Sequence, residues 1–396
     1  MADLPFVDIT VPGFDLASGE VTAVMEGNWC MRTPLGLAVL GYAEMQDLMR
    51  DPRLVQDGRA YLELVGITSG PVHDWFVPLI LHQHGQDHAR LRRLVNRAFT
   101  PAVVNGLLPF IRETTASLTG ELASAELQDF IEVFADPLPV RVMSGLLGIP
   151  AEDYGAFHRW STDIGLVYAL VQYPEYLPRL EAAVRGLFAY VDGLVRTRER
   201  DPGDDLVSHL IRAQDHETPI GPEELRNLVV SIIFAAHDTT SHQLGQSMVA
   251  FAAHPGQWRT LREHPELAPQ AVEELLRWCP AVTAAYRSAR QDVDYKGMHI
   301  PAGSFVAMCV KSAHRDRRTF HAPEVFDITV PRRAAPLVFG TGPHFCLGAA
   351  TARTELREAL VALTSRLGPP SVSGEPPWRG GLGICGPESL HLHFAS

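Results

Sequence analysis

Length, composition and charge define the broad class of this chain. It has 396 residues, of which 46% are hydrophobic and 20% charged, a balance that excludes a disordered or fibrous protein and predicts a soluble globular one. Lys and Arg number 34 against 46 Asp and Glu, so the net charge of -12 argues against a general nucleic-acid or anionic-membrane role. Length alone predicts two or three domains.

Targeting signals and cysteine spacing bear on where the chain works. The N-terminal stretch lacks the basic region and the long apolar run of a secretion signal, so we expect no export. The most apolar internal stretch, residues 228–236, is much shorter than the ~20 residues that cross a bilayer, so we expect no membrane anchor. Five widely spaced cysteines predict free thiols and a cytoplasmic protein.

Helical patterns dominate the first two thirds of the chain. Apolar residues recur at helical spacing from about residue 87 to 201. The predicted breaks are Pro101, Pro137, Pro150 and Pro202. The longest predicted helix covers about residues 221–253. Proline suits its first turn, and the acids that follow interact favourably with the positive end of the helix dipole. A helix of that length must cross the whole molecule.

The chain changes character after a predicted helix at about residues 268–278. A strand-rich stretch follows, with apolar residues between glycine turns. These residues are Val293, Tyr295, Ile300, Phe305, Val306 and Val310. A last helix is expected at about residues 347–367 and a short hairpin over residues 380–396. The pattern predicts a mainly α-helical protein with a minor β region.

The segment Phe339-Gly340-Thr341-Gly342-Pro343-His344-Phe345-Cys346-Leu347-Gly348 is the most informative. Its first two glycines allow tight turns, and Cys346 stands just before a helix, where amide donors and the dipole lower a thiol pKa and stabilise a thiolate. A thiolate is a good ligand for a soft metal. Cys30, Cys279 and Cys309 are expected to be inert buried thiols. No third glycine follows at the spacing of a dinucleotide loop.

This segment resembles the haem-binding loop of the cytochrome P450 family, Phe-Gly-x-Gly-x-His-x-Cys-x-Gly, at every fixed position. The resemblance implies that Cys346 is the axial ligand of the iron of haem b and that Phe339 packs against the sulfur. It also implies that amides just after Cys346, near Gly348, tune the reduction potential of the iron. It also implies one triangular P450 domain over residues 1–396, which overrides the expectation from length.

A second motif lies inside the long predicted helix, at Ala235-Ala236-His237-Asp238-Thr239-Thr240. Asp and Thr side chains compete for backbone hydrogen bonds, so the sequence predicts a local loosening or bulge there. The turn is similar to the oxygen-activation motif of the family, which implies that Asp238 and Thr239 deliver protons. Ala236 stands where the family often has glycine, and His237 is expected to point away from the haem.

Cations for the haem propionates are the third feature. His88 and Arg92 lie one turn apart on one helix face and resemble the His-x-x-x-Arg clamp of the family, which Arg287 and His344 would join. An ordinary polar loop is the alternative for the histidines of residues 82–88. A zinc site there is disfavoured because no acid or cysteine stands at ligand spacing.

A fourth motif concerns the core of the fold. Glu274 and Arg277 share one face of a predicted helix and resemble the structural Glu-x-x-Arg pair of the family. The loop that should supply a third partner offers either Arg332 or Arg333.

Two surfaces follow from position in the family. The loop of residues 56–84 and the helices of residues 153–173 would help to form a largely apolar substrate pocket. The individual lining residues expected are Phe234, Ala235, Val282, Thr283 and Ile384. Five other arginines either form a basic patch that steers an acidic electron donor or are ordinary solvated helix residues. They are Arg90, Arg93, Arg97, Arg353 and Arg357.

The resemblance implies a haem-thiolate monooxygenase that inserts one atom of O2 into a small apolar or aromatic organic substrate, as a tailoring hydroxylase of secondary metabolism. No flavin or iron–sulfur motif is visible, so a ferredoxin and its NAD(P)H-dependent reductase would supply electrons. An oxidative C-C or C-O/C-N coupling enzyme is the main alternative. A non-catalytic haem-bearing binding module is a weaker one. A peroxide-driven variant would be expected to lack Asp238 and Thr239.

Overall fold

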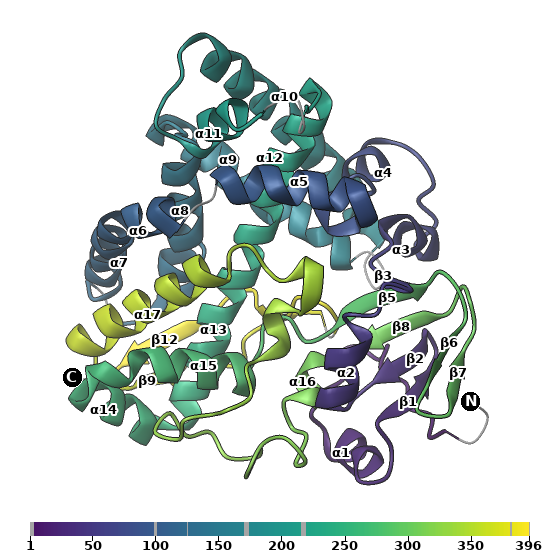
Figure 1. Ribbon diagram of the computed structural model, residues 1–396. Helices are drawn as coiled ribbons and strands as arrows, with labels where there is room; N and C mark the ends of the chain where they lie inside the picture. Colours follow the sequence, from purple (N-terminus) through teal and green to yellow (C-terminus); the bar gives the residue numbers. More distant parts are fainter. Residues whose placement is uncertain are drawn as a thin grey trace.

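The structure is a computed structural model that describes residues 4–98, 101–124, 126–169, 174–214, 219–380 and 382–395. Its outline is roughly triangular, with helices over most of the molecule and the largest sheet gathered in one corner near the N-terminus (Figure 1). The predicted class, mainly α with a minor β region, is confirmed. Among the described residues, no helix has both the length and the apolar character needed to cross a bilayer.

The helices account for most of the ordered chain. The α-helices are α1 (Gly19–Met25), α2 (Tyr42–Leu48), α3 (Gly58–Leu64), α4 (Pro71–Phe76), α5 (Gly85–Ala98), α6 (Pro101–Gly106), α7 (Leu108–Leu122), α8 (Pro137–Leu147), α9 (Tyr154–Ile164), α10 (Leu177–Arg200), α11 (Leu206–Arg212), α12 (Pro222–Ala236), α13 (Asp238–Ala253), α14 (Pro255–Glu263), α15 (Ala268–Trp278), α16 (Val310–Ala313) and α17 (Ala349–Arg366). The other helical turns are η1 (Ile80–His82), η2 (Ile131–Ala135), η3 (Ala151–Asp153), η4 (Gly165–Ala169), η5 (Pro174–Tyr176), η6 (Pro265–Leu267), η7 (Leu337–Phe339) and η8 (Gly342–His344).

The proline breaks predicted between residues 87 and 201 are confirmed, because each of the four prolines lies at or next to a helix boundary. The region that the sequence presented as a loop, residues 56–84, is instead largely helical and contains α3 and α4. Short helices of six or seven residues carry too few periodic positions to be recognised from their pattern. Residues 170–173 of the expected pocket helices lie outside the described residues.

The strands form small sheets. They are β1 (Cys30–Thr33), β2 (Gly36–Val39), β3 (Leu54–Val55), β4 (Gln128–Asp129), β5 (Ala285–Ala289), β6 (Val293–Tyr295), β7 (Met298–Ile300), β8 (Phe305–Met308), β9 (Pro370–Val372), β10 (Trp378–Arg379), β11 (Gly386–Pro387) and β12 (His391–Phe394). The largest sheet has the order β1-β2-β8-β5-β3, in which only the β2–β8 pair is parallel.

Two expectations about the strands are wrong in detail. Val310 begins α16 instead of extending β8. The C-terminal hairpin is also displaced: β10 pairs with β11, whereas β12 pairs with β9 and β4. The first error arises because α16 has only four residues, too few to show a helical pattern in the sequence. The second arises because β12 pairs with β4, more than 260 positions earlier in the chain, and local alternation does not identify such a partner.

The long predicted helix is divided in two at His237, whose backbone angles are φ -86° and ψ -73°. Its outer bounds match the prediction within one residue at Pro222 and at Ala253. The Thr239 hydroxyl donates to the carbonyl oxygen of Ala235 at 3.1 Å, so a side chain competes for a helical acceptor as the sequence predicted. The predicted loosening is confirmed, and it separates two large apolar clusters that pack around α12 and around α13.

Candidate functional site

An internal cavity of about 390 Å³ lies between the α12–α13 break and the loop that precedes α17. The predicted site residues that line it are His88, Arg92, Phe234, Ala235, Thr239, Val282, Arg287, Phe339, His344, Cys346, Gly348 and Ile384. The structure therefore brings together segments from most of the chain. Thr283 is an exception among the expected pocket residues: it is buried outside the lining, and its hydroxyl donates to the Gly383 carbonyl oxygen at 3.1 Å.

The loop before α17 presents the Cys346 thiol to the cavity. Gly340 and Gly342 have φ values of 66° and 72°, which side chains other than glycine rarely adopt, so the loop turns tightly at both positions. The Cys346 amide donates to the carbonyl oxygen of Phe339 at 2.9 Å and closes the loop. The thiol is accessible from the cavity although protein atoms surround it on the other sides.

The sequence expectation for the ionisation of this thiol is wrong. Burial raises the pKa of Cys346, and it outweighs the backbone amides of Gly348 and Ala349 and the charges of Arg92 and Arg353, which all favour the thiolate. The position before a helix therefore does not by itself produce a thiolate. A metal ion would, because coordination deprotonates a thiol outright.

Four cationic or titratable groups line the same cavity as Cys346. Arg287 is buried and donates only to the carbonyl oxygen of Tyr286, at 2.8 Å, and burial lowers its pKa to about 10. Arg92 donates to the Phe345 carbonyl oxygen at 2.6 Å. The His88 and His344 rings lie 4.0 Å apart, and burial, assisted by the neighbouring positive charges, lowers the pKa of His344 to about 3.

Arg92 and Arg287, the charged members of this group, have no acidic partner within the described parts of the chain. A buried charge without a partner is costly, so the site requires an anionic ligand. Haem b has two propionate carboxylates and an iron that accepts a thiolate, so both the cations and Cys346 fit it. The residues present therefore match the cofactor that the sequence implied.

The Glu274–Arg277 pair is buried on α15, the helix that contacts the start of the cysteine loop at η7. Arg277 donates to the two carboxylate oxygens of Glu274 at 2.7 and 2.8 Å, and Arg332 donates to the same two oxygens at 3.0 Å each. The alternative that the sequence left open is thus decided for Arg332 over Arg333. Burial disfavours the ionised carboxylate of Glu274, but the two guanidinium groups outweigh it and lower the pKa.

Thr239 and Asp238 occupy different environments although they are adjacent. Thr239 lines the cavity, whereas Asp238 is buried behind it and is not part of the lining. Oδ2 of Asp238 accepts a hydrogen bond from Arg379 at 2.8 Å, and Oδ1 lies 3.6 Å from Nδ1 of His237. His237 is also absent from the lining, as the sequence led us to expect.

Sequence reasoning missed several residues of the site. Arg379 lies 141 positions from Asp238 on a two-residue strand, and no local pattern marks it. Tyr61 and Tyr286 contribute to an aromatic wall with Phe76 and Tyr168, in which neighbouring ring centroids are 5.6 to 6.2 Å apart. The wall supports the expectation of a largely apolar pocket, and it surrounds the side of the cavity nearest Phe234.

The expected basic patch is largely neutralised. Arg90 pairs with Glu224, Arg353 with Glu273, and Arg357 with Glu358. Most of the positive charge that the sequence grouped together is thus cancelled by acids from other elements, which leaves little support for that patch as a donor-docking surface.

Glu355 of α17 gives a pH-dependent prediction. It is buried beside the cavity, its Oε2 has no hydrogen-bond partner in the part of the chain that the structure describes, and burial raises its pKa from 4.5 to about 8. The folded protein then binds a proton that the unfolded chain releases, so the contribution of Glu355 to stability is greatest below pH 4.5 and falls as the pH rises towards 8. We expect Glu355→Gln to raise the free energy of unfolding at pH 7 by about 3 kcal/mol and to leave it unchanged at pH 4. Urea unfolding at both pH values measures this, and an equal effect at both would contradict it.

The helical shell, the cavity-facing thiol and the buried cations together define the class of haem-thiolate proteins. Comparison with known proteins agrees. A family model described as Cytochrome P450 matches residues 161–368. The chain is 45% identical to luteothin monooxygenase of Streptomyces thioluteus, over 100% of this chain and 97% of that protein. It is 33% identical to the polyketide biosynthesis cytochrome P450 PksS of Bacillus subtilis, over 89% of this chain and 88% of that protein.

Among solved structures, the cytochrome P450 enzyme CxnD for C-S bond formation in chuangxinmycin biosynthesis superposes with a TM-score of 0.87. The alignment covers 99% of this chain and 97% of that one, at 29% sequence identity. The chain belongs to the cytochrome P450 family. It is a haem b-dependent monooxygenase of secondary metabolism. The family, the activity and the cofactor expected from the sequence are therefore confirmed.

Proposed function

We propose that this enzyme hydroxylates an apolar, polyketide-type compound held against the aromatic wall of the cavity. The observation that carries the proposal is the single cavity onto which both the Cys346 thiol and the apolar wall open. The names of its relatives luteothin monooxygenase and PksS support the substrate class. Bound haem supplies the activation of O2 and the oxidation of the substrate carbon.

The residues of this chain act around the cofactor. Cys346 would hold the haem iron through its thiolate, while Arg92, Arg287, His88 and His344 would bind the propionates. Phe339 packs near the cysteine loop, where the Arg353 guanidinium lies 4.4 Å from the centre of its ring. The aromatic wall excludes water from the substrate, and the Thr239 hydroxyl, at the cavity surface, holds a proton that Asp238 replenishes.

Thr239→Ala tests that last assignment. Without the hydroxyl, no group at position 239 positions the proton for transfer. We therefore expect product formation to fall about tenfold while NAD(P)H consumption continues and hydrogen peroxide accumulates. The measurement is the ratio of product to NAD(P)H consumed. Thr239→Ser, which retains the hydroxyl, should preserve most of the coupling, and an unchanged ratio in Thr239→Ala would reject the role.

Partners and location complete the proposal. Electrons would come from a ferredoxin and its NAD(P)H-dependent reductase, with O2 as the oxidant. A cytoplasmic location is supported by the cysteines, because all five are free thiols, as expected in a reducing compartment.

The deciding experiment is a titration of the ferric enzyme with luteothin and with 6-deoxyerythronolide B, the compounds that appear in the names of two of its relatives. Substrate binding is measured as a shift of the Soret band from its low-spin to its high-spin position. A saturating shift followed by a product heavier by one oxygen atom supports hydroxylation. A product lighter by two hydrogens favours oxidative coupling, the second candidate, for which the likeness to CxnD is the specific observation. No shift with either compound contradicts the substrate class.

A further inference from the structure

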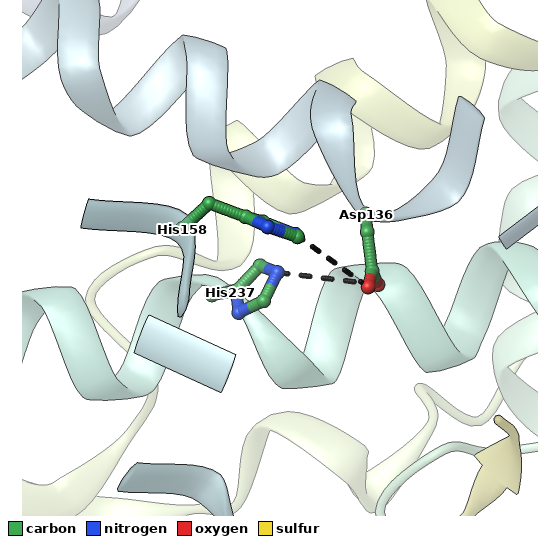
Figure 2. Close-up of side chains that lie close together, drawn as sticks. All are labelled: Asp136, His158 and His237. Atoms are coloured by element: carbon green, nitrogen blue, oxygen red, sulfur yellow. Dashed lines mark ion pairs between the residues drawn. The ribbon is translucent and has the colours of Figure 1, made fainter. Parts of the chain in front are cut away.

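A row of polar side chains connects the protein surface to Asp238. It consists of His158 in α9, Asp136 between η2 and α8, and His237 at the α12–α13 break (Figure 2). Nε2 of His158 lies 3.6 Å from Oδ2 of Asp136, and Nε2 of His237 lies 4.0 Å from Oδ1 of the same carboxylate. The other nitrogen of His237, Nδ1, lies 3.6 Å from Oδ1 of Asp238.

Burial increases along this row. The exposed fraction of the side chain is 38% for His158, 21% for Asp136 and 3% for His237. Among the described residues, neither ring nitrogen of His237 has a hydrogen-bond partner. A buried ring with two unpaired nitrogens costs free energy, so apolar packing alone does not explain a histidine at this position.

The His237 ring is placed to exchange protons on both sides. One nitrogen faces the carboxylate of Asp136 and the other faces that of Asp238, and imidazole can accept a proton on one nitrogen and release it from the other. The separations of 3.6 to 4.0 Å exceed a direct hydrogen bond, so transfer requires a bridging water or a side-chain movement of less than an ångström.

We propose that His237 reloads Asp238 with protons from solvent, that Asp136 holds the protonated ring, and that His158 is the solvent-facing entrance. The Nδ1 proton of His237 moves to Oδ1 of Asp238, and Nε2 of His237, which faces Asp136, regains a proton that enters from solvent through His158. This inference rests on the proposed function, because it requires Asp238 to supply Thr239.

The other charged groups around His237 fit this assignment. Burial opposes ionisation of Asp136, but His158, His237 and the Ser241 hydroxyl outweigh it and lower the pKa, so Asp136 stays negative. Arg379 of β10, with Glu388 beside it, binds the far oxygen of Asp238 and does not release protons at neutral pH. His242, one turn further along α13, stays neutral because burial lowers its pKa to about 4.

His237→Gln tests the relay, with His242→Gln as the matched control, since His242 is equally buried on the same segment and also lacks hydrogen-bond partners. With luteothin as the substrate probe, we expect His237→Gln to slow product formation about tenfold and to increase the solvent deuterium isotope effect. His242→Gln should stay within about twofold of the parent enzyme on both measures. Equal isotope effects in the parent enzyme and His237→Gln would overturn the relay.

Asp238→Asn separates failure of the relay from failure of the proposed function. If Asp238→Asn slows turnover and His237→Gln does not, only the relay is wrong. If neither variant changes turnover, the role of Asp238 fails and the relay fails with it. If both slow turnover and raise the isotope effect, the relay is supported.

A second readout needs no turnover. In 15N-histidine NMR spectra, the His237 resonances should move towards those of the neutral ring in Asp136→Asn, because the ring loses its counter-charge; unchanged resonances would overturn the role of Asp136. The same three side chains have ligand atoms within 4.8 Å of one another, so a metal ion is the competing occupant. One zinc ion per chain that disappears in Asp136→Asn would overturn the relay, and a metal-free protein in which the His237 resonances respond to Asp136→Asn supports it.

Discussion

Cys346→Ser is expected to abolish monooxygenation. A serine hydroxyl does not ionise at neutral pH, and as a neutral oxygen ligand it lacks the electron donation by which a thiolate favours cleavage of the O-O bond. The variant should lose the characteristic Soret band that the thiolate gives to the reduced carbon monoxide complex, and product formation should fall below detection. Absorption spectra of the reduced complex, followed by product analysis, measure the two effects.

The control for this prediction is Cys385→Ser. Cys385 is partly buried outside the cavity lining, and its sulfur donates to the Gly380 carbonyl oxygen at 2.8 Å, a contact that a serine hydroxyl can also make. We expect its spectrum and turnover to match the parent enzyme. A thiolate band that survives in Cys346→Ser would mean that another cysteine is the ligand, and the four remaining cysteine-to-serine variants would then identify it.

The sequence was sufficient where structure depends on local pattern. The helix expected at residues 268–278 has those bounds in the structure, and the loosening expected near Asp238 appears as the break at His237. Capping, proline position and side-chain competition for backbone acceptors act over a few residues, so they are legible in the chain. The contiguous motif around Cys346 was recognisable for the same reason.

Long-range contacts were not legible. Strands β1 and β2 have four residues each. They join the largest sheet through the pairing of β2 with β8, which lies more than 260 positions later in the chain. Arg379 reaches Asp238, and Tyr286 reaches the aromatic wall, only after the chain has folded. The prediction of a lowered pKa for Cys346 was wrong for a related reason. Burial is a property of the tertiary structure, and its effect on the pKa outweighed that of the local helix terminus.

Glu274→Ala is expected to destabilise the protein by about 3–5 kcal/mol, the cost of breaking a buried ion pair. Glu274 is fully buried, Arg277 is 1% exposed and Arg332 is 9% exposed. Removal of one carboxylate would leave two guanidinium groups facing each other in the interior without a counter-charge. The effect should appear in urea unfolding as a lower midpoint with an unchanged slope, and in cells as a low yield of haem-loaded protein.

Glu273→Ala is the matched control, because it removes the preceding carboxylate on the same helix. Glu273 pairs with Arg353, but the side chains are 34% and 33% exposed, so solvent screens the charges and the loss should be no more than about 1 kcal/mol. The difference between the two variants isolates burial as the cause, since helix, residue type and substitution are the same. Equal destabilisation by the two variants would show that Glu274 is not a buried structural anchor. A large loss for Glu274→Ala that Arg332→Leu partly relieves would show that the unpaired cations are the source of the cost.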